Sequence, residues 1–418
     1  MQKELPVTAF VIFPSGAFGG AEKRFTNLFL HLSRLYPGKF HYIINPLMKK
    51  HIERVFSGVT FDNLHIIETG KDTSAGVVQG GAPAVFNDIT EDPVSADKDT
   101  SALRKLYRYG KNKLKQKNIF KQIDSIRKQN GIKVLIGIFA GGPPLVFYKE
   151  KNITGVKIVF SDMDSWFTDI LPDKKRLWYR KYYSFNNILQ NADMVDFLSP
   201  YIADGVKKLG VNIPEEKISV APCSFIDYSK CIPGSKEPFE IAFAGRLEPD
   251  KNPLMYLEAA KIVLKKYPGI KFHLLGEGSL VAEINSFIKN NQMEENTNFI
   301  FHNNPPEIFS RTSVFVSLQS GTNYPSQSVL EAMACGNALI ASNTGDTGLF
   351  INSGNGVLTT LNANAVADAM LQLIMDKEKT KQMGKNAREF VLNNHTLEKA
   401  SGYYIEMIKS VYGDGYIG

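Results

Sequence analysis

The feature that most constrains the fold is a pattern that occurs twice: an apolar strand, a loop of small and polar residues, and an amphipathic helix. Strand 7–13 leads through loop 14–20 into a segment whose apolar residues lie three or four positions apart, the period of a helix packed on a sheet. The same order restarts with strand 241–244, loop 245–252 and Pro253, which the first turn of a helix tolerates. Strand, loop and helix in this order open a doubly wound domain. The predicted fold class is therefore α/β, with two domains that are each built on a parallel sheet.

The length of the chain and its further apolar segments agree with two domains. At 418 residues the chain exceeds the roughly 250–300 residues at which one hydrophobic core stops growing. We predict a first domain over residues 1–225 and a second over 226–396, with a polar linker at 224–238. Further strands are predicted at 134–139, 157–160, 194–198, 272–275, 298–301, 314–318 and 338–341, and helices at 280–289 and 326–334.

The composition excludes several classes of protein. No run of about 18 uncharged apolar residues occurs, so we expect no transmembrane helix. The three cysteines, Cys223, Cys231 and Cys335, rule out a complete disulfide framework and favour a reducing cytoplasm. The seven histidines fall singly, so no metal-ligand cluster is predicted. A net charge of +7 is modest for this length, and without a nucleic-acid-binding motif it predicts no nucleic-acid partner.

Three segments interrupt the alternation of strands and helices. Residues 72–101 are rich in Gly, Ala, Asp and Thr, and their length predicts a mobile insertion. Residues 104–127 carry nine Lys or Arg side chains, and residues 173–183 combine cations with aromatic rings. Each basic segment is either a solvated helix face or a surface that docks on an anionic membrane or a glycan acceptor. The second reading predicts a peripheral protein at the inner face of the cell membrane.

Cations follow the first strand of the second domain. The loop after strand 241–244 places Arg246 near the end of the strand and Lys251 near the start of the next helix, where ligands of open α/β sheets bind. A planar guanidinium and a compact ammonium together suit a diphosphate leaving group, whose negative charge grows as a glycosidic bond breaks. Two solvated loop charges are the simpler reading of this motif taken alone.

A second loop follows strand 314–318 and enters a helix through small and polar residues. We expect the backbone N–H groups of Ser326, Gln327 and Ser328 to bind phosphate at the positive end of the helix dipole. Glu331, one to two turns into the helix, could reach a ribose diol. The alternatives are a helix cap for Ser326 and a surface carboxylate for Glu331.

With these motifs in place, the chain resembles the GT4-type glycosyltransferase family of the GT-B fold over nearly its whole length. The resemblance rests on Gly19-Gly20-Ala21-Glu22, Gly245-Arg246 to Lys251, Gly276-Glu277-Gly278 and Leu330-Glu331-Ala332-Met333-Ala334-Cys335-Gly336, in the family's order. It implies two Rossmann-like domains that face a central cleft, with helix 397–418 completing the first domain. It also implies that Arg246 and Lys251 bind the donor diphosphate, that Glu331 contacts the ribose, and that Gly276 lines the donor site. The Gly19-Gly20 backbone would close over the phosphates from the first domain.

Two positions depart from the family pattern. The family usually has a Glu that contacts the transferred sugar eight positions before the one matched by Glu331, and Asn323 stands there. An amide can still bond sugar hydroxyls, so we interpret Asn323 as a change of donor-sugar preference. Many members also carry a His after a strand of the first domain, where this chain offers Asp162 and Asp164. Either aspartate could position sugar hydroxyls and stabilise positive charge at the anomeric carbon, although a helix cap is a rival role for Asp164.

The resemblance implies a retaining glycosyltransferase that moves a sugar from a nucleoside-diphosphate sugar to a glycan or lipid-linked acceptor, in cell-surface polysaccharide biosynthesis. No cofactor and no metal are expected. A pyridoxal-phosphate-dependent phosphorylase would carry a cofactor lysine in a much longer chain, and a sugar-nucleotide epimerase is a further alternative. A rival from another class is a non-catalytic relative that binds nucleotide sugar or glycan as a partner subunit. Asn323 and the missing His favour that reading.

Overall fold

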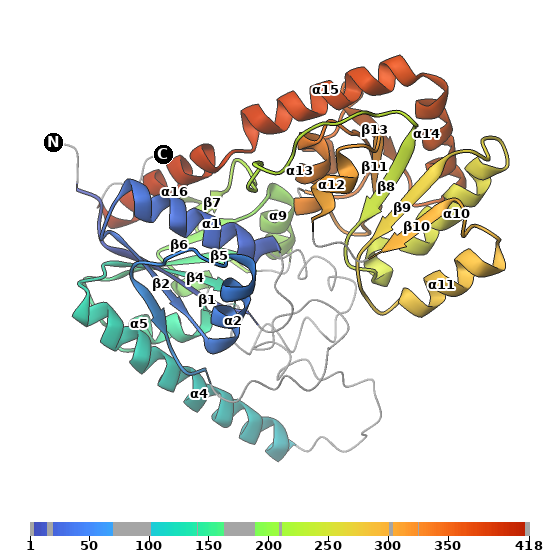
Figure 1. Cartoon of the computed structure of the whole chain (residues 1–418). Helices are drawn as coiled ribbons and strands as arrows, with labels where there is room; N and C mark the ends of the chain where they lie inside the picture. Colours follow the sequence, from blue (N-terminus) through green and yellow to red (C-terminus); the bar gives the residue numbers. More distant parts are fainter. Residues whose placement is uncertain are drawn as a thin grey trace. The chain divides into compact units, whose positions relative to one another are not determined.

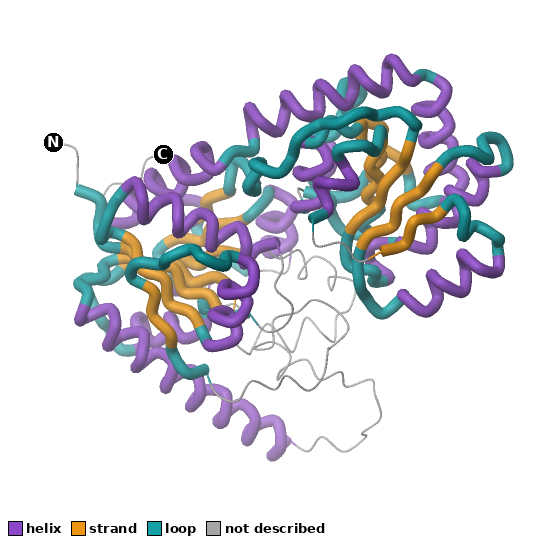
Figure 2. The backbone as a smooth tube through the Cα atoms, in the orientation of Figure 1, coloured by secondary structure: helices purple, strands orange, loops and turns teal. Residues whose placement is uncertain are grey.

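The chain divides into two compact units, each with strands at its centre and helices on both sides of the sheet (Figures 1 and 2). Unit 1 comprises Met1–Pro222 and Ala400–Gly418, and unit 2 comprises Cys223–Lys399. The computed structural model describes residues 4–14, 20–69, 102–139, 141–162, 189–208, 211–300, 304–324 and 326–413.

Unit 1 is built on a seven-stranded sheet with the order β3-β2-β1-β4-β5-β6-β7. All of its strand pairs are parallel. The order reverses between β1 and β4, as in doubly wound folds. The strands are β1 (Thr8–Phe13), β2 (Phe40–Ile44), β3 (Leu64–Ile66), β4 (Val134–Phe139), β5 (Lys157–Asp162), β6 (Met194–Phe197) and β7 (Ile218–Val220).

Helices cover both faces of this sheet. The helices among its described residues are α1 (Gly20–Leu35), α2 (Pro46–Val55), α4 (Ala102–Gln129), α5 (Val146–Glu150), α9 (Pro200–Lys208) and α16 (Leu397–Tyr412). Two short 3-10 turns, η1 (Pro143–Leu145) and η2 (Glu215–Lys217), are also present. On one face, Ile119, Phe120 and Ile123 of α4 pack against strand residues such as Val11. On the other face, the ring of Tyr404 from α16 lies 6.1 Å from that of Phe10 and 6.0 Å from that of Phe25. The last helix of the chain is therefore part of the core of unit 1.

Unit 2 repeats this architecture with a six-stranded parallel sheet of order β10-β9-β8-β11-β12-β13. Here the order reverses between β8 and β11, which creates the topological switch point of this sheet. The strands are β8 (Glu240–Ala244), β9 (Lys271–Leu275), β10 (Thr297–Ile300), β11 (Val314–Ser317), β12 (Ala338–Ser342) and β13 (Gly356–Thr359).

Two apolar clusters sandwich this second sheet. One contains side chains of α10 (Pro253–Leu264), α11 (Val281–Asn290) and α14 (Ala363–Met375). The other contains side chains of α12 (Pro305–Phe309), α13 (Gln327–Ala334) and α15 (Lys377–Asn394). Two 3-10 turns, η3 (Pro249–Lys251) and η4 (Thr347–Leu349), follow β8 and β12. The predicted fold class, α/β with two Rossmann-like parallel-sheet domains, is confirmed. The central cleft stays a prediction.

The segment predicted as a linker, 224–238, has neither helix nor strand, but it is packed into unit 2 rather than spanning the two units. Ile226 and Cys231 are 6% and 2% exposed and belong to the core on the α13 side of the sheet. The polar composition suggested a linker between the domains, whereas the few apolar side chains between the polar ones anchor the segment in unit 2.

Candidate functional site

The candidate site lies in unit 2, at the carboxyl ends of β8 and β11. These two strands are hydrogen-bonded neighbours, and the chain continues from them to opposite sides of the sheet, to β9 after β8 and to β12 after β11. Ligands of open α/β sheets bind at such a switch point. The loop after β8 carries Arg246 and Lys251, and the loop after β11 leads into α13, which carries Glu331. The fold therefore brings to one edge of one sheet the motifs that the sequence separates by about 70 residues.

Side-chain hydrogen bonds join these two loops. The Lys251 ammonium donates to Gln319 Oε1 over 2.6 Å. Asn252, in the left-handed region with φ of 52°, donates its amide to the carbonyl of Leu318 at 2.7 Å and to Ser320 Oγ at 3.1 Å. No local sequence pattern indicates Gln319 and Asn252 as site residues, because their partners lie 66 to 68 positions away.

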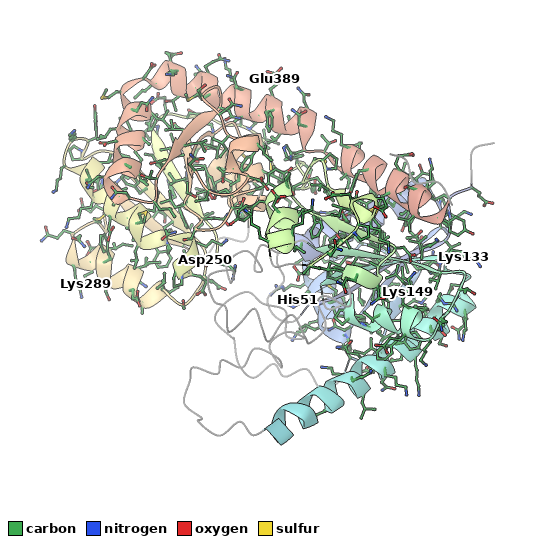
Figure 3. All side chains as sticks on the ribbon, turned by 180° about the vertical axis from the view of Figure 1, so that it is seen from behind. His51, Lys133, Lys149, Asp250, Lys289 and Glu389 are labelled. Carbon is green, nitrogen blue, oxygen red and sulfur yellow. The ribbon has the colours of Figure 1, made fainter. Side chains whose placement is uncertain are left out.

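The two cations of the first loop differ in their surroundings. Arg246 is 53% exposed, and its guanidinium lies 4.0 Å from a carboxylate oxygen of Asp250. Lys251 is only 21% exposed and lies 3.3 Å from the same carboxylate, which Figure 3 labels. An ion pair between two side chains as exposed as these contributes little to stability, so the Arg246 guanidinium is available to a ligand. Lys251 is instead held in place by the loop.

The motif Gly276-Glu277-Gly278 supports the first loop from β9. Gly276 has φ of 145°, and a Cβ there would lie 1.9 Å from the carbonyl oxygen of Gly245. A Cβ on Gly278 would lie 2.4 Å from the carbonyl oxygen of Leu247, whose N–H donates to the carbonyl of Glu277 at 2.8 Å. Only glycine permits this approach of two backbones. A direct contact of Gly276 with a donor stays a prediction.

The start of α13 is capped by its own residues. Ser326 is the N-cap, and its Oγ accepts from the N–H of Val329 at 3.3 Å, so the capping role weighed for this side chain is present. The N–H of Ser326 donates to the carbonyl of Asn323 at 3.1 Å. It is therefore already engaged, which goes against its predicted use for phosphate. Gln327 and Ser328 form the first turn of the helix, and phosphate binding there stays a prediction. Glu331 follows one turn later and is partly exposed.

The other end of α13 is fixed by a lysine that sequence reasoning missed. Lys236 donates its ammonium to the carbonyls of Phe309, Thr312 and Cys335 at 2.9, 2.7 and 2.8 Å. It thereby binds carbonyl groups at the ends of α12 and α13, where a cation also complements the helix dipole. Burial lowers the pKa of Lys236 to about 8. The position of α13 is thus set at both ends before any ligand binds.

Asn323 is not placed as the sequence suggested. Its side chain is 0% exposed, and the amide bonds to Ser317, Ser342 and Thr347. Both branches of the amide are hydrogen-bonded inside unit 2. In this arrangement the amide offers no surface to a sugar, which goes against the predicted contact with sugar hydroxyls.

The candidates in unit 1 fall largely outside the described residues. Gly19 and Asp164 lie in segments that the structure does not describe. Gly20 begins α1, and Asp162 is the last residue of β5, although only its backbone is described. The roles predicted for these four residues stay predictions. The basic aromatic segment 173–183 and the segment 72–101 also lie outside the described residues.

One buried carboxylate of unit 1 was not predicted from the sequence. Asp196 on β6 is 0% exposed and accepts hydrogen bonds from the hydroxyls of Ser161, Tyr403 and Tyr404. Burial raises its pKa to about 6, although these hydroxyl donors act in the opposite direction. The sequence feature that could have indicated this buried carboxylate is a charged residue inside the otherwise apolar strand 194–198.

Helix α4 carries the first basic segment on the surface of unit 1. Among its described side chains, Leu114 is 68% exposed, while Ile119, Phe120 and Ile123 pack into the core. Figures 1 and 3 show the amino-terminal turns of α4 extending beyond the sheet. Among the described side chains of the basic segment 104–127, the exposed lysines are Lys111, Lys113, Lys115, Lys117 and Lys121.

In the described part of the chain, no group of three or more His, Cys, Asp or Glu side chains could hold a metal ion. None of its helices is both long enough and apolar enough to cross a membrane.

Comparison with known proteins identifies the family of unit 2. Residues 229–390 match the glycosyl transferases group 1 family. A poly(ribitol-phosphate) alpha-N-acetylglucosaminyltransferase of Staphylococcus aureus (strain COL) is 26% identical over 175 residues, which are 41% of this chain and 35% of that protein. A UDP-Gal:alpha-D-GlcNAc-diphosphoundecaprenol alpha-1,3-galactosyltransferase of Escherichia coli is 29% identical over 217 residues, which are 47% of this chain and 54% of that protein. The match thus spans only about a third to a half of these relatives.

A solved structure agrees over nearly the whole chain. The Anabaena protein HepE, in complex with UDP and glucose, is 15% identical with a TM-score of 0.68, and the alignment covers 97% of this chain and 100% of that chain. At this identity the likeness shows the fold alone, which is the fold of both units. Since the family match covers 229–390 and includes Arg246, Lys251 and Glu331, unit 2 of this chain belongs to the glycosyl transferases group 1 family.

Proposed function

We propose that the chain is a retaining glycosyltransferase that moves a sugar from a nucleoside-diphosphate sugar to a glycan or lipid-linked acceptor. The observation that carries this proposal is the arrangement at the β8/β11 switch point, inside the segment that matches the family. An exposed Arg246, a half-buried Lys251 tied to Gln319, and the capped start of α13 lie on loops at one edge of one sheet.

These groups suit a diphosphate that leaves from the anomeric carbon of a sugar. The Arg246 fork and the Lys251 ammonium would bind phosphate oxygens and stabilise the charge that develops on them as the bond breaks. The first turn of α13 would add N–H donors, and Glu331 would accept from the ribose hydroxyls. In a retaining reaction the leaving phosphate takes the acceptor proton on the same face of the sugar. Asp162 and Asp164 would then only orient hydroxyls, and no protein base is needed.

The class of acceptor is supported by the relatives. One of the two named relatives modifies a poly(ribitol-phosphate), and the other modifies a sugar carried on diphosphoundecaprenol. The first of these acceptors is a polymer and the second is lipid-linked. For this chain we propose an acceptor of one of these two kinds, in the synthesis of a cell-surface polysaccharide. The matched region covers only part of each relative, so the acceptor of this chain is a proposal that rests on likeness within unit 2.

We further propose that α4 brings the enzyme to an anionic membrane from the cytoplasmic side. Lys111, Lys113, Lys115, Lys117 and Lys121 are exposed on this helix, and Leu114 is exposed among them. Ile119, Phe120 and Ile123 of the same helix pack into the core. Each cation near an anionic surface contributes about 1 kcal/mol, so four of them supply about 4 kcal/mol. Such binding is reversible and needs no transmembrane segment.

The test is a reaction of the full chain with a panel of nucleoside-diphosphate sugars, followed by nuclear magnetic resonance. Slow release of nucleoside diphosphate from one donor is expected even without acceptor, with the product keeping the anomeric configuration of the donor. Release with inversion would contradict the retaining mechanism. Binding of a donor without any turnover, with or without added glycan, would point to the non-catalytic partner subunit. If no donor in the panel binds, the proposal fails.

A further inference from the structure

The buried side chain of Asn323 is hydrogen-bonded through both branches of its amide. Its Oδ1 accepts from Ser317 Oγ at 2.6 Å. Its Nδ2 donates to Ser342 Oγ at 2.8 Å, to the carbonyl of Ser342 at 3.2 Å and to Thr347 Oγ1 at 3.2 Å. These partners lie at the ends of β11 and β12 and at the start of η4. The amide therefore joins three elements beneath the loop that leads to α13.

The partners dictate an amide at this position. A hydroxyl has one proton to donate. Ser342 Oγ gives its proton to the carbonyl of Gln319 at 2.7 Å, and Thr347 Oγ1 gives its proton to the carbonyl of Thr344 at 2.6 Å. Toward Asn323 both hydroxyls can therefore only accept, as does the carbonyl of Ser342. One branch of the side chain must donate and the other must accept, which an amide does and a carboxylate does not.

The main chain of Asn323 extends this network into the start of α13. Its N–H donates to Thr347 Oγ1 at 3.2 Å, and its carbonyl accepts from the N–H of Ser326, the cap of α13. The neighbouring Thr322 Oγ1 accepts from the N–H of Asp346 at 3.2 Å, so the loop after β12 also holds the loop after β11. The segment that positions the first turn of α13 is fixed from two neighbouring strands.

We propose that Asn323 is a positioning residue: its buried amide presets the loop between β11 and α13, and it does not touch the donor sugar. This inference rests on the proposed function. It replaces the reading of Asn323 as a choice of donor sugar, because the identity of the side chain is already determined by Ser317, Ser342 and Thr347. Loss of the amide disturbs the loop, and with it everything that the start of α13 binds.

The test compares two ligands that differ only in the sugar. Affinities of wild type and Asn323→Asp are measured by calorimetry for UDP, ADP and GDP and for the corresponding glucose conjugates. If Asn323 is a positioning residue, the substitution weakens the binding of the nucleoside diphosphate and of its sugar conjugate by the same factor, about tenfold or more. The reason is that at least one hydrogen-bond donor is exchanged for an acceptor. Weaker binding of the conjugate alone would show direct contact with the sugar and overturn the inference.

Asn337 supplies a matched control. It is also 0% exposed, its Oδ1 accepts from Thr312 Oγ1 at 2.8 Å, and its Nδ2 donates to the carbonyls of Phe309 and Ala332 at 2.8 and 2.9 Å. Asn337→Asp disturbs an equally buried amide that lies after the carboxyl end of α13. It is expected to lower the melting temperature while nucleotide affinity stays unchanged. Equal loss of affinity in both variants would mean general destabilisation, and it would overturn the positioning role.

A second measurement tests the network without any ligand. The carboxylate of Asn323→Asp faces acceptors in a buried site, so its pKa is raised above the ordinary value of about 3.9. Protonation restores one donor, and the gap in melting temperature between wild type and variant should shrink as the pH falls from about 8 to about 5. A gap that is independent of pH would contradict the network. If wild type binds none of the nucleotides, the proposed function fails. The pH dependence of the melting temperature still tests whether the hydrogen-bond network around Asn323 exists.

Discussion

The hydroxyl of Tyr403, on the last helix of the chain, donates to the carboxylate of Asp196 on β6 over 2.5 Å. The same carboxylate accepts from Ser161 Oγ at 2.8 Å and from the Tyr404 hydroxyl at 2.9 Å. Tyr403 also contacts Ser219 Oγ at 2.6 Å. Helix α16 follows unit 2 in sequence, and this buried cluster fastens it to unit 1 by polar contacts that complement the apolar packing of Tyr404 on Phe10.

Asp196→Asn should remove a pH-dependent part of the stability. Burial raises the pKa of Asp196 to about 6, so between about pH 4 and 6 the folded protein binds more protons at this site than the unfolded chain does. The contribution of this group to the free energy of unfolding therefore falls as the pH rises, by about 3 kcal/mol in all. Denaturant unfolding at pH 4, 5, 6 and 7 measures the free energy of unfolding of both proteins. The difference between wild type and Asp196→Asn is expected to fall as the pH rises.

Tyr403→Phe provides the paired variant for this measurement. It removes one donor to the carboxylate, which raises the pKa of Asp196 further and moves the fall in stability to higher pH. Parallel pH profiles for wild type and Asp196→Asn would mean that Asp196 does not titrate in this range, contrary to the burial that the structure gives it.

Most of the fold follows from patterns that are local in the sequence. The strands β1, β4, β8 and β11 are buried apolar runs next to turn residues, and each lies within one residue of its predicted bounds. The strands β3 and β7 were missed because they have three residues each and half-exposed side chains, which leaves no apolar run to recognise. β2 was missed although it is fully buried, since a histidine interrupts its apolar pattern.

The candidate site was predictable only in part, for a different reason. Arg246 and Lys251 follow directly after a recognisable strand, so the sheet topology places them at a ligand-binding edge. The role of Asn323 depends on Ser342 and Thr347, which lie 19 and 24 positions further along the chain. No local pattern indicates that these three side chains meet. The resemblance suggested that Asn323 contacts the transferred sugar, whereas long-range packing buries its side chain.

Glu331→Gln should reduce the discrimination between ribose and 2′-deoxyribose. A carboxylate that accepts from the ribose hydroxyls gains about 1.5–3 kcal/mol from a charge-assisted bond, and a neutral amide gains less. Wild type is expected to bind a ribonucleoside diphosphate more tightly than its 2′-deoxy analogue, with a smaller ratio in the variant. The control is Glu389→Gln, which changes an exposed carboxylate on α15 (Figure 3). If the ratio of ribonucleotide to deoxyribonucleotide affinity is the same in all three proteins, Glu331 does not contact the ribose.

Reversal of charge on α4 should abolish attachment to anionic vesicles. Wild type is expected to co-sediment with vesicles that contain phosphatidylglycerol and not with neutral phosphatidylcholine vesicles, and to dissociate as added salt shortens the Debye length below about 8 Å. Substitution of Lys111, Lys115 and Lys121 by Glu should prevent binding, while the same substitution at Lys261, Lys265 and Lys289 in unit 2 should not. Equal partitioning onto both vesicle types, or none onto either, would leave α4 as a solvated helix and favour a soluble acceptor.

The central claim, that unit 2 holds a nucleoside diphosphate at the β8/β11 switch point, is tested most directly by calorimetry on Arg246→Ala. Arg311 is the matched control, because it is 50% exposed and pairs with Glu240 at the amino end of β8, on the opposite edge of the sheet. Loss of a charge-assisted phosphate contact should weaken binding of the nucleoside diphosphate that wild type prefers by about 1.5–3 kcal/mol, or roughly 10- to 150-fold. Arg311→Ala should leave the affinity unchanged. Unchanged affinity in Arg246→Ala, or an equal loss in both variants, would contradict the assignment.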